Sequence, residues 1–175
     1  MRPTDSTKPA PGNGGESLAA KNASAEFVTF TLGSEEFGVD IMLVREIRGW
    51  VATTPIPHAP EYVRGVINLR GLIVPILDLR SRFRIGVTEA TKTHVVIIVN
   101  NGTQTVGLLA DTVSDIINVE RQAIQPIPES VSDSQEKILN GLVILDGGRL
   151  VTLVSLTGLF GNRNDAGTAS ESKAA

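Results

Sequence analysis

The sequence predicts a mainly β protein: two small β-barrels packed together, with one or two short helices. Most apolar residues fall in short, β-branched segments separated by turn motifs such as GSEE, NNG and DGG. Two blocks of this pattern occur twice along the chain. The 175 residues, 41% of them hydrophobic, suffice for one good core or for two small cores in contact. These three observations together favour twin barrels.

The expected elements follow in order. The first strand covers residues 26–32, whose positions 28, 30 and 32 are all large and apolar. A helix is expected next, because Asp40 can cap it, Leu43, Val44 and Ile47 fall on one face, and Gly49 can end it. Further strands are expected at 63–69, directly after it, and at 93–99, 104–109, 114–119, 141–145 and 149–156.

Both ends of the chain differ in composition from its middle. Residues 1–25 and 162–175 consist mainly of small and polar residues, which cannot bury enough apolar surface to offset the entropy of ordering. We predict that both are disordered tails. The folded domain is expected at residues 26–161.

An internal duplication organises this domain. The pattern of residues 27–47 returns at 93–116, and that of 65–83 returns at 141–160. Gly65 and Gly71 correspond to Gly141 and Gly147 at the same offset of 76. We expect a first barrel at about 26–86 and a second at about 90–161, with strands that can be exchanged between them.

The two repeats differ in charge. The positions equivalent to Arg64 and Arg70 are Asn140 and Asp146. Residues 41–84 hold seven arginines and three acids, whereas residues 85–161 hold four basic residues and eight acids. Arginine is therefore not required by the barrel itself, and the first repeat is the better candidate for an adapted function.

Composition narrows the classes of function. The net charge of −3 gives no overall attraction to nucleic acid or to an anionic membrane. The absence of cysteine excludes disulfides and thiolate metal sites. The longest apolar run, residues 72–77, is far shorter than the roughly 20 residues of a membrane helix, and the N-terminus lacks the apolar core of a secretion signal. We expect a soluble, cytoplasmic protein.

Catalytic and metal-binding residues are not evident. His58 and His94 each lack a second ligand at metal-binding spacing, and no nucleophile elbow or phosphate-binding loop occurs. Asp111 and Asp115 lie in an acidic repeat, where carboxylates are usually just solvated. No catalytic, cofactor or metal site is predicted, and the protein is expected not to be an enzyme.

Two binding functions remain open. A cationic barrel could bind single-stranded nucleic acid, but residues 41–84 offer only Trp50, Tyr62 and Phe83 for base stacking. A protein interface fits better, because Arg64 and Arg70 share one face of the 63–69 segment, and guanidinium groups can hold a partner's carboxylate or carbonyl.

On the expected helix, Met42 and Glu46 would share the outward side. An ordinary surface ion pair between Glu46 and Arg70 explains the same residues equally well.

Several blocks in order resemble one known family. FTLGSEEFGVDI, VREIRG, TPIPHAPEYVRGVINLRGLIVPILDLR, VGLLADTVSDI and NGLVILDGGRLVTLVSL are similar to the CheW-like coupling proteins of bacterial chemotaxis. The resemblance covers essentially all of residues 26–160. It implies two five-stranded, SH3-like barrels without enzymatic activity or cofactor.

The resemblance also implies partners and contact residues. Such proteins join the cytoplasmic tips of chemoreceptors to the CheW-like regulatory domain of the chemotaxis histidine kinase, are recruited to membrane-associated receptor arrays, and are monomeric when free. The receptor hairpin would lie in a groove between the barrels, and the kinase domain would bind at a barrel end. The implied receptor contacts are Val44, Glu46, Ile47, Gly65, Arg70 and Ile116, and the implied kinase contacts are Val39 and Met42.

This chain departs from the family pattern at two positions. Leu72 stands where the family often has a polar residue. Ser130 stands where the family often has a large aromatic residue, which implies a weaker second kinase contact.

Overall fold

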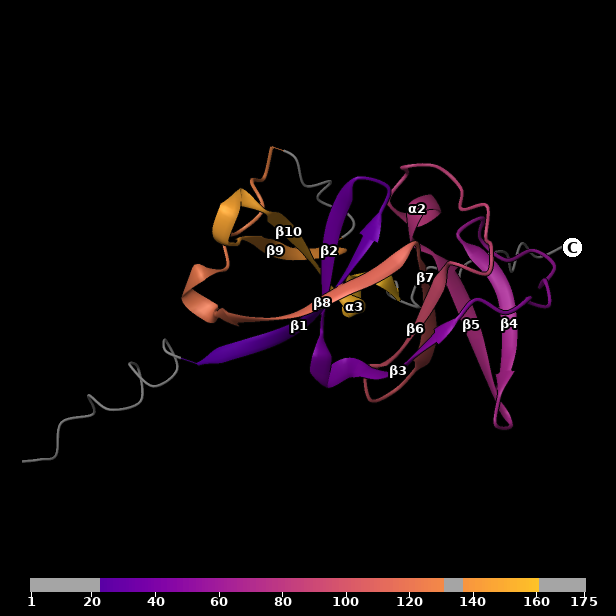
Figure 1. The fold of residues 1–175 in the computed structure, drawn as a ribbon. Coiled ribbons are helices and arrows are strands. Elements are labelled where there is room, and N and C mark those ends of the chain that lie inside the picture. The colour runs from indigo at the N-terminus through magenta and orange to yellow at the C-terminus, as the bar shows by residue number, and fades with distance from the viewer. Residues whose placement is uncertain (1–22, 131–136, 161–175) are drawn as a thin grey trace, which may run out of the picture.

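The computed structural model describes residues 23–130 and 137–160, which form two five-stranded sheets and a few short helices (Figure 1). The mainly β class is confirmed. The strands are β1 (Ser24–Leu32), β2 (Glu35–Asp40), β3 (Val44–Gly49), β4 (Val63–Leu69), β5 (Leu72–Asp78), β6 (Val95–Asn100), β7 (Thr105–Ala110), β8 (Thr112–Glu120), β9 (Leu139–Ile144) and β10 (Leu150–Val154). The short helices are η1 (Ile41–Leu43), α2 (Leu79–Arg82), η2 (Arg121–Ala123), η3 (Asp146–Gly148) and α3 (Leu156–Leu159).

The first strand begins earlier than predicted. Ser24 and Ala25, assigned above to a disordered tail, already pair with Glu120 and Val119 of β8. Most of the two predicted tails lies outside the described residues.

The two sheets exchange strands between the repeats. Sheet A has the order β8-β1-β2-β10-β9, and sheet B has the order β3-β6-β7-β5-β4. In sheet A, β2 pairs in parallel with β10 of the second repeat, and in sheet B, β7 pairs in parallel with β5 of the first. Figure 1 shows the yellow C-terminal strands beside the indigo N-terminal ones. The boundaries 26–86 and 90–161 therefore delimit sequence repeats and not the two sheets.

Both sheets bring their edge strands together at equivalent points. Thr54, which follows β3, bridges β4, and Gln125, which follows β8, bridges β9. A Cβ atom on Gly65 would lie 2.3 Å from the carbonyl oxygen of Thr54, and one on Gly141 would lie 2.8 Å from that of Gln125. The close approach of two backbones thus explains why both repeats carry glycine here.

We expect Gly65→Ala to lower the free energy of unfolding by about 2–4 kcal/mol, because the new methyl group meets backbone and the φ angle is strained. The φ of Gly65 is +134°. Gly71→Ala is the matched control: its φ is also positive, at +89°, but nothing lies within 4 Å of the added Cβ. It should cost about 1 kcal/mol. Urea unfolding measures both, and equal losses would refute the steric explanation.

The predicted helix from Asp40 to Gly49 is wrong. The Asp40 carboxylate does accept a hydrogen bond from the Met42 N–H at 2.9 Å, but the helix it caps ends at Leu43. Residues 44–49 instead form β3, which pairs antiparallel with β6. The apolar spacing fits a helix and a strand equally well, and the buried strand β6 needs a partner on this edge.

The central core is shared by the two sheets. The largest cluster of buried side chains includes Phe30 and Val39 of sheet A with Ile97 and Leu108 of sheet B. Two smaller clusters belong to one sheet each. Burial of β6 and β7 explains their nearly continuous apolar sequences.

Each repeat ends its last strand with a capped short helix. Asp78, which is 0% exposed, accepts hydrogen bonds from two N–H groups of the first turn of α2 at 3.0 and 3.3 Å. It also accepts bonds from the N–H and hydroxyl of Thr88 at 2.8 and 2.7 Å, and Arg64 lies 3.7 Å away. Ser155 caps α3 at the equivalent place with a single bond from Gly158 at 3.4 Å.

A second, half-buried ion pair ties sheet A to sheet B. Asp111 receives two hydrogen bonds from the Arg80 guanidinium and one from the Gly33 N–H at 2.7 Å. Burial by itself raises the pKa of Asp111, but these hydrogen bonds outweigh it and leave the pKa below its usual value.

This lowered pKa predicts a stability term that depends on pH. A carboxylate with a depressed folded pKa stabilises the protein above its unfolded pKa of about 4, and the term is lost as pH falls through the folded pKa. We expect Asp111→Asn to be less stable than the wild type at pH 7, with the difference shrinking below about pH 4. Urea unfolding at several pH values measures it, and a difference that is constant with pH would contradict this account.

Candidate partner-binding site

Arg70 lies at the tip of the β4–β5 hairpin. Leu69 and Leu72 pair directly, which leaves Arg70 and Gly71 as a two-residue turn with φ of +50° and +89°. Positive φ at both positions matches the twist of the flanking strands. Asn68 Oδ1 accepts a hydrogen bond from the Gly71 N–H at 2.7 Å and so fixes the turn. The turn presents the Arg70 side chain, 76% exposed, to the surface.

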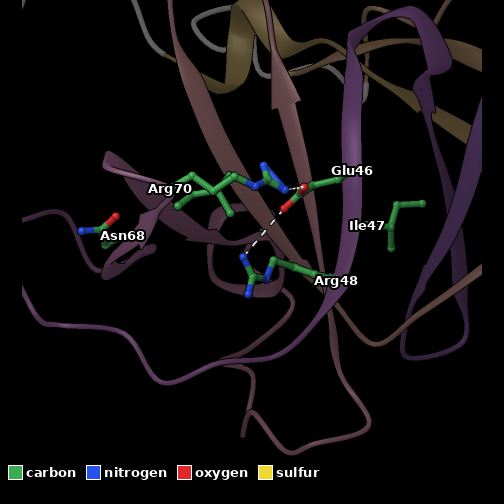
Figure 2. Close-up of a pocket in the computed structure, with 6 residues that line it drawn as sticks. Glu46, Ile47, Arg48, Asn68 and Arg70 are labelled. Carbon is green, nitrogen blue, oxygen red and sulfur yellow. Dashed lines mark hydrogen bonds and ion pairs between the residues drawn. The ribbon is translucent and has the colours of Figure 1, made fainter.

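Three charged side chains meet beside this turn. Arg70 Nη2 donates to Glu46 Oε2 at 2.5 Å, and Arg48 Nη1 lies 3.7 Å from Glu46 Oε1 (Figure 2). One carboxylate thus stands between two guanidinium groups, and the cluster carries a net charge of +1. It borders a surface hollow of about 490 Å³ between β3 and the β4–β5 hairpin, lined by Glu46, Ile47, Arg48, Asn68, Leu69 and Arg70.

The predicted receptor contacts do not all share this hollow. Ile47 is one of the lining residues, although Figure 2 shows its side chain on the side of β3 opposite to Arg70. Ile116 lies in β8 of sheet A and is 60% exposed. Val44 is half-buried against the central core. Glu46 and Arg70 are the two predicted residues that the structure brings into contact.

Two predicted contact residues are buried. Val39, predicted as a kinase contact, is 0% exposed, because it pairs with Val28 near the end of β2 and packs into the central core. Gly65, predicted as a receptor contact, is buried under the Thr54 backbone. Both residues lie in the interior of the fold. Met42, the other predicted kinase contact, is 83% exposed.

Arg64 and Arg70, which the sequence pattern places on one face of a strand, have different surroundings in the structure. Arg64 lies 3.7 Å from the buried carboxylate of Asp78, and its guanidinium sits 5.9 Å from the ring centre of Trp50. Arg64 therefore has a structural role. The second arginine of the charged cluster is Arg48 and not Arg64. Arg48 was not predicted from the sequence as a site residue. Reading residues 44–49 as a strand would have placed Arg48 on the same face as Glu46.

Sheet A carries a cluster of the opposite charge, formed by residues of both repeats. Arg149 donates to Glu36 at 2.6 and 3.2 Å and lies 3.9 Å from Asp115. The bonds to Glu36 raise the pKa of Arg149. Here one guanidinium stands between two carboxylates. The net charge of this cluster is −1, and its acidic excess comes from Glu36 of the first repeat.

Within residues 23–130 and 137–160, no group of His, Asp and Glu side chains has the geometry to hold a metal ion. His94 accepts a hydrogen bond from the Thr91 N–H at 3.0 Å and lies 3.5 Å from Asp111, which gives it a structural role. Asp111 and Asp115 are each paired with a different arginine. No described helix is long and apolar enough to cross a membrane.

Comparison with known proteins decides the family. Residues 26–164 match the family described as "CheW-like domain". The chain belongs to the CheW-like family.

Relatives of this CheW-like protein support the assignment. It is 45% identical over 139 residues to "Chemotaxis protein CheW" of Rhizobium meliloti (strain 1021), covering 79% of this chain and 89% of the relative. It is 40% identical over 149 residues to the protein of the same name from Klebsiella aerogenes, covering 85% and 89%.

A solved structure supports it as well. The "Crystal structure of scaffolding protein TtCheW from Thermoanaerobacter tengcongensis" superposes with a TM-score of 0.71 at 34% identity, covering 80% of this chain and 90% of that one. The predicted membership of the CheW-like chemotaxis scaffolds and the predicted mainly β fold are confirmed.

Proposed function

We propose that this CheW-like protein is a non-enzymatic scaffold that couples chemoreceptors to the chemotaxis histidine kinase. It binds the helical tip of the receptor beside Glu46 and Arg70, and it binds the CheW-like regulatory domain of the kinase near Met42. It acts in the cytoplasm and is recruited from there to receptor arrays.

The exposed pair of Arg70 and Glu46 carries this proposal. Arg70 adopts a left-handed conformation, which a residue with a side chain adopts at a cost, and its side chain remains in solvent. The second repeat has Asp146 at the equivalent turn, so the fold does not need arginine here. Ile47 and Ile116, at equivalent positions of edge strands β3 and β8, add exposed apolar contacts. Val44 lies at the start of β3.

A three-component assay tests the coupling. A soluble receptor-tip fragment and the regulatory domain of the kinase should co-elute only when this protein is added. Co-elution that does not depend on this protein, or its failure to retain either partner, would overturn the proposal.

We expect Met42→Asp to weaken binding of the kinase domain at least about tenfold and to leave receptor-tip binding unchanged. Met42 is exposed on η1 and makes few contacts that the fold could lose. A charged side chain there would be desolvated on contact with an apolar partner surface. Isothermal titration with each partner measures the effect. Equal weakening of both would mean that the surfaces are not separate.

The nucleic-acid alternative loses support, because the aromatic rings of residues 41–84 are already occupied. Arg64 lies over Trp50, Arg82 lies 4.7 Å from the ring centre of Tyr62, and Phe83 stacks on Phe37. Bases could stack on these rings only after displacing contacts within the chain.

A further inference from the structure

The guanidinium of Arg48 makes fewer hydrogen bonds within the chain than we expect of an arginine with a purely structural role. Its Nη1 atom lies 3.7 Å from Glu46, which is beyond hydrogen-bond distance. Its Nε atom is buried and has no acceptor among the described residues. An unpaired buried donor costs free energy, so the fold alone gives no reason to keep this guanidinium.

Glu46 does not accept hydrogen bonds from both arginines of the cluster. Its Oε2 atom is held by Arg70 at 2.5 Å, and its Oε1 atom remains out of reach of Arg48. The cluster keeps a net charge of +1 and faces the hollow beside the β4–β5 turn (Figure 2). A second carboxylate would make it neutral and give an acceptor to the accessible part of the Arg48 guanidinium, whose side chain is 35% exposed.

We propose that Arg48 is a specificity residue of the receptor site and holds a carboxylate of the receptor tip. The Asp or Glu side chain enters the hollow and receives charge-assisted hydrogen bonds from Arg48, while Glu46 continues to pair with Arg70. This inference rests on the proposed function, because it names the chemistry by which the receptor is recognised.

The cluster around Arg149 in sheet A offers a matched control. Arg149 is also partly exposed and ion-paired, but it already bonds to Glu36 and stands near a second carboxylate. A cluster with a net charge of −1 has no reason to attract another carboxylate. Arg149→Met therefore removes the same group from a place where no effect on receptor binding is expected.

The test is titration of a receptor-tip fragment into the full-length protein at about 50 mM salt, where charge contacts are weakly screened. We expect Arg48→Met to weaken binding at least about tenfold, Arg48→Lys to recover part of the loss, and Arg149→Met to have no effect. Replacing the acidic residues of the tip one at a time by their amides should identify one whose loss is not additive with Arg48→Met.

The possible failures are distinguishable. If the tip binds Arg48→Met as tightly as the wild type, or if every amide variant is additive with it, the carboxylate inference is overturned and the proposed function stands. If the wild-type protein does not bind the tip at all, both are overturned. Circular dichroism of each variant excludes loss of fold as the cause of weaker binding.

Discussion

An Arg70→Glu variant is expected to lose receptor-tip binding by about a hundredfold or more while keeping its fold. The substitution changes the cluster with Glu46 and Arg48 from a net charge of +1 to −1 and places two carboxylates side by side. The fold should tolerate this, since the side chain is 76% exposed and a surface ion pair contributes only about 0–1 kcal/mol. Isothermal titration and thermal unfolding measure the two quantities.

The equivalent turn supplies the control. Asp146→Lys also reverses a charge at a hairpin tip, but in the acidic second repeat, and should leave receptor binding unchanged. If Arg70→Glu unfolds the protein, or if Asp146→Lys weakens binding equally, the proposed role of Arg70 is wrong.

An Asp78→Ala variant is expected to lose about 3–5 kcal/mol of unfolding free energy. Its carboxylate is fully buried, and its removal leaves four hydrogen-bond donors without their acceptor. The charge of Arg64 would also lose its partner. Chemical denaturation of wild type and variant measures the loss.

Ser155→Ala provides the comparison within the same molecule. Ser155 caps α3 as Asp78 caps α2, but it accepts one long hydrogen bond and balances no charge. Its loss should cost about 1 kcal/mol. Similar losses for the two variants would mean that the Asp78 network contributes no more than an ordinary helix cap.

The sequence predicted the two-fold repeat and most strands, because β-branched segments recur in the same order and two glycines recur at one offset. It could not predict β3. Leu43, Val44 and Ile47 suit either a helix or a strand, and the choice depends on β6, which arrives much later in the chain. Because residues 44–49 were predicted as helix, Arg48 was not predicted to lie beside Glu46.

The candidate site was predicted in part, for a related reason. Charge pattern and family resemblance identified Glu46 and Arg70, which are in contact. Motif transfer also selected Val39 and Gly65, which are buried. A motif records which residues a family shares and does not separate those that hold the backbone from those that meet a partner.

The parallel pairing of β2 with β10 has a consequence for biosynthesis. Glu36 pairs with Val151, so one edge of β2 has no partner until β10, more than 100 residues later, has emerged from the ribosome. The amino-terminal hairpin must therefore remain a nascent intermediate with an open, aggregation-prone edge. Because each sheet contains strands of both repeats, the repeats cannot fold one at a time, and cutting the chain between them would leave two incomplete fragments.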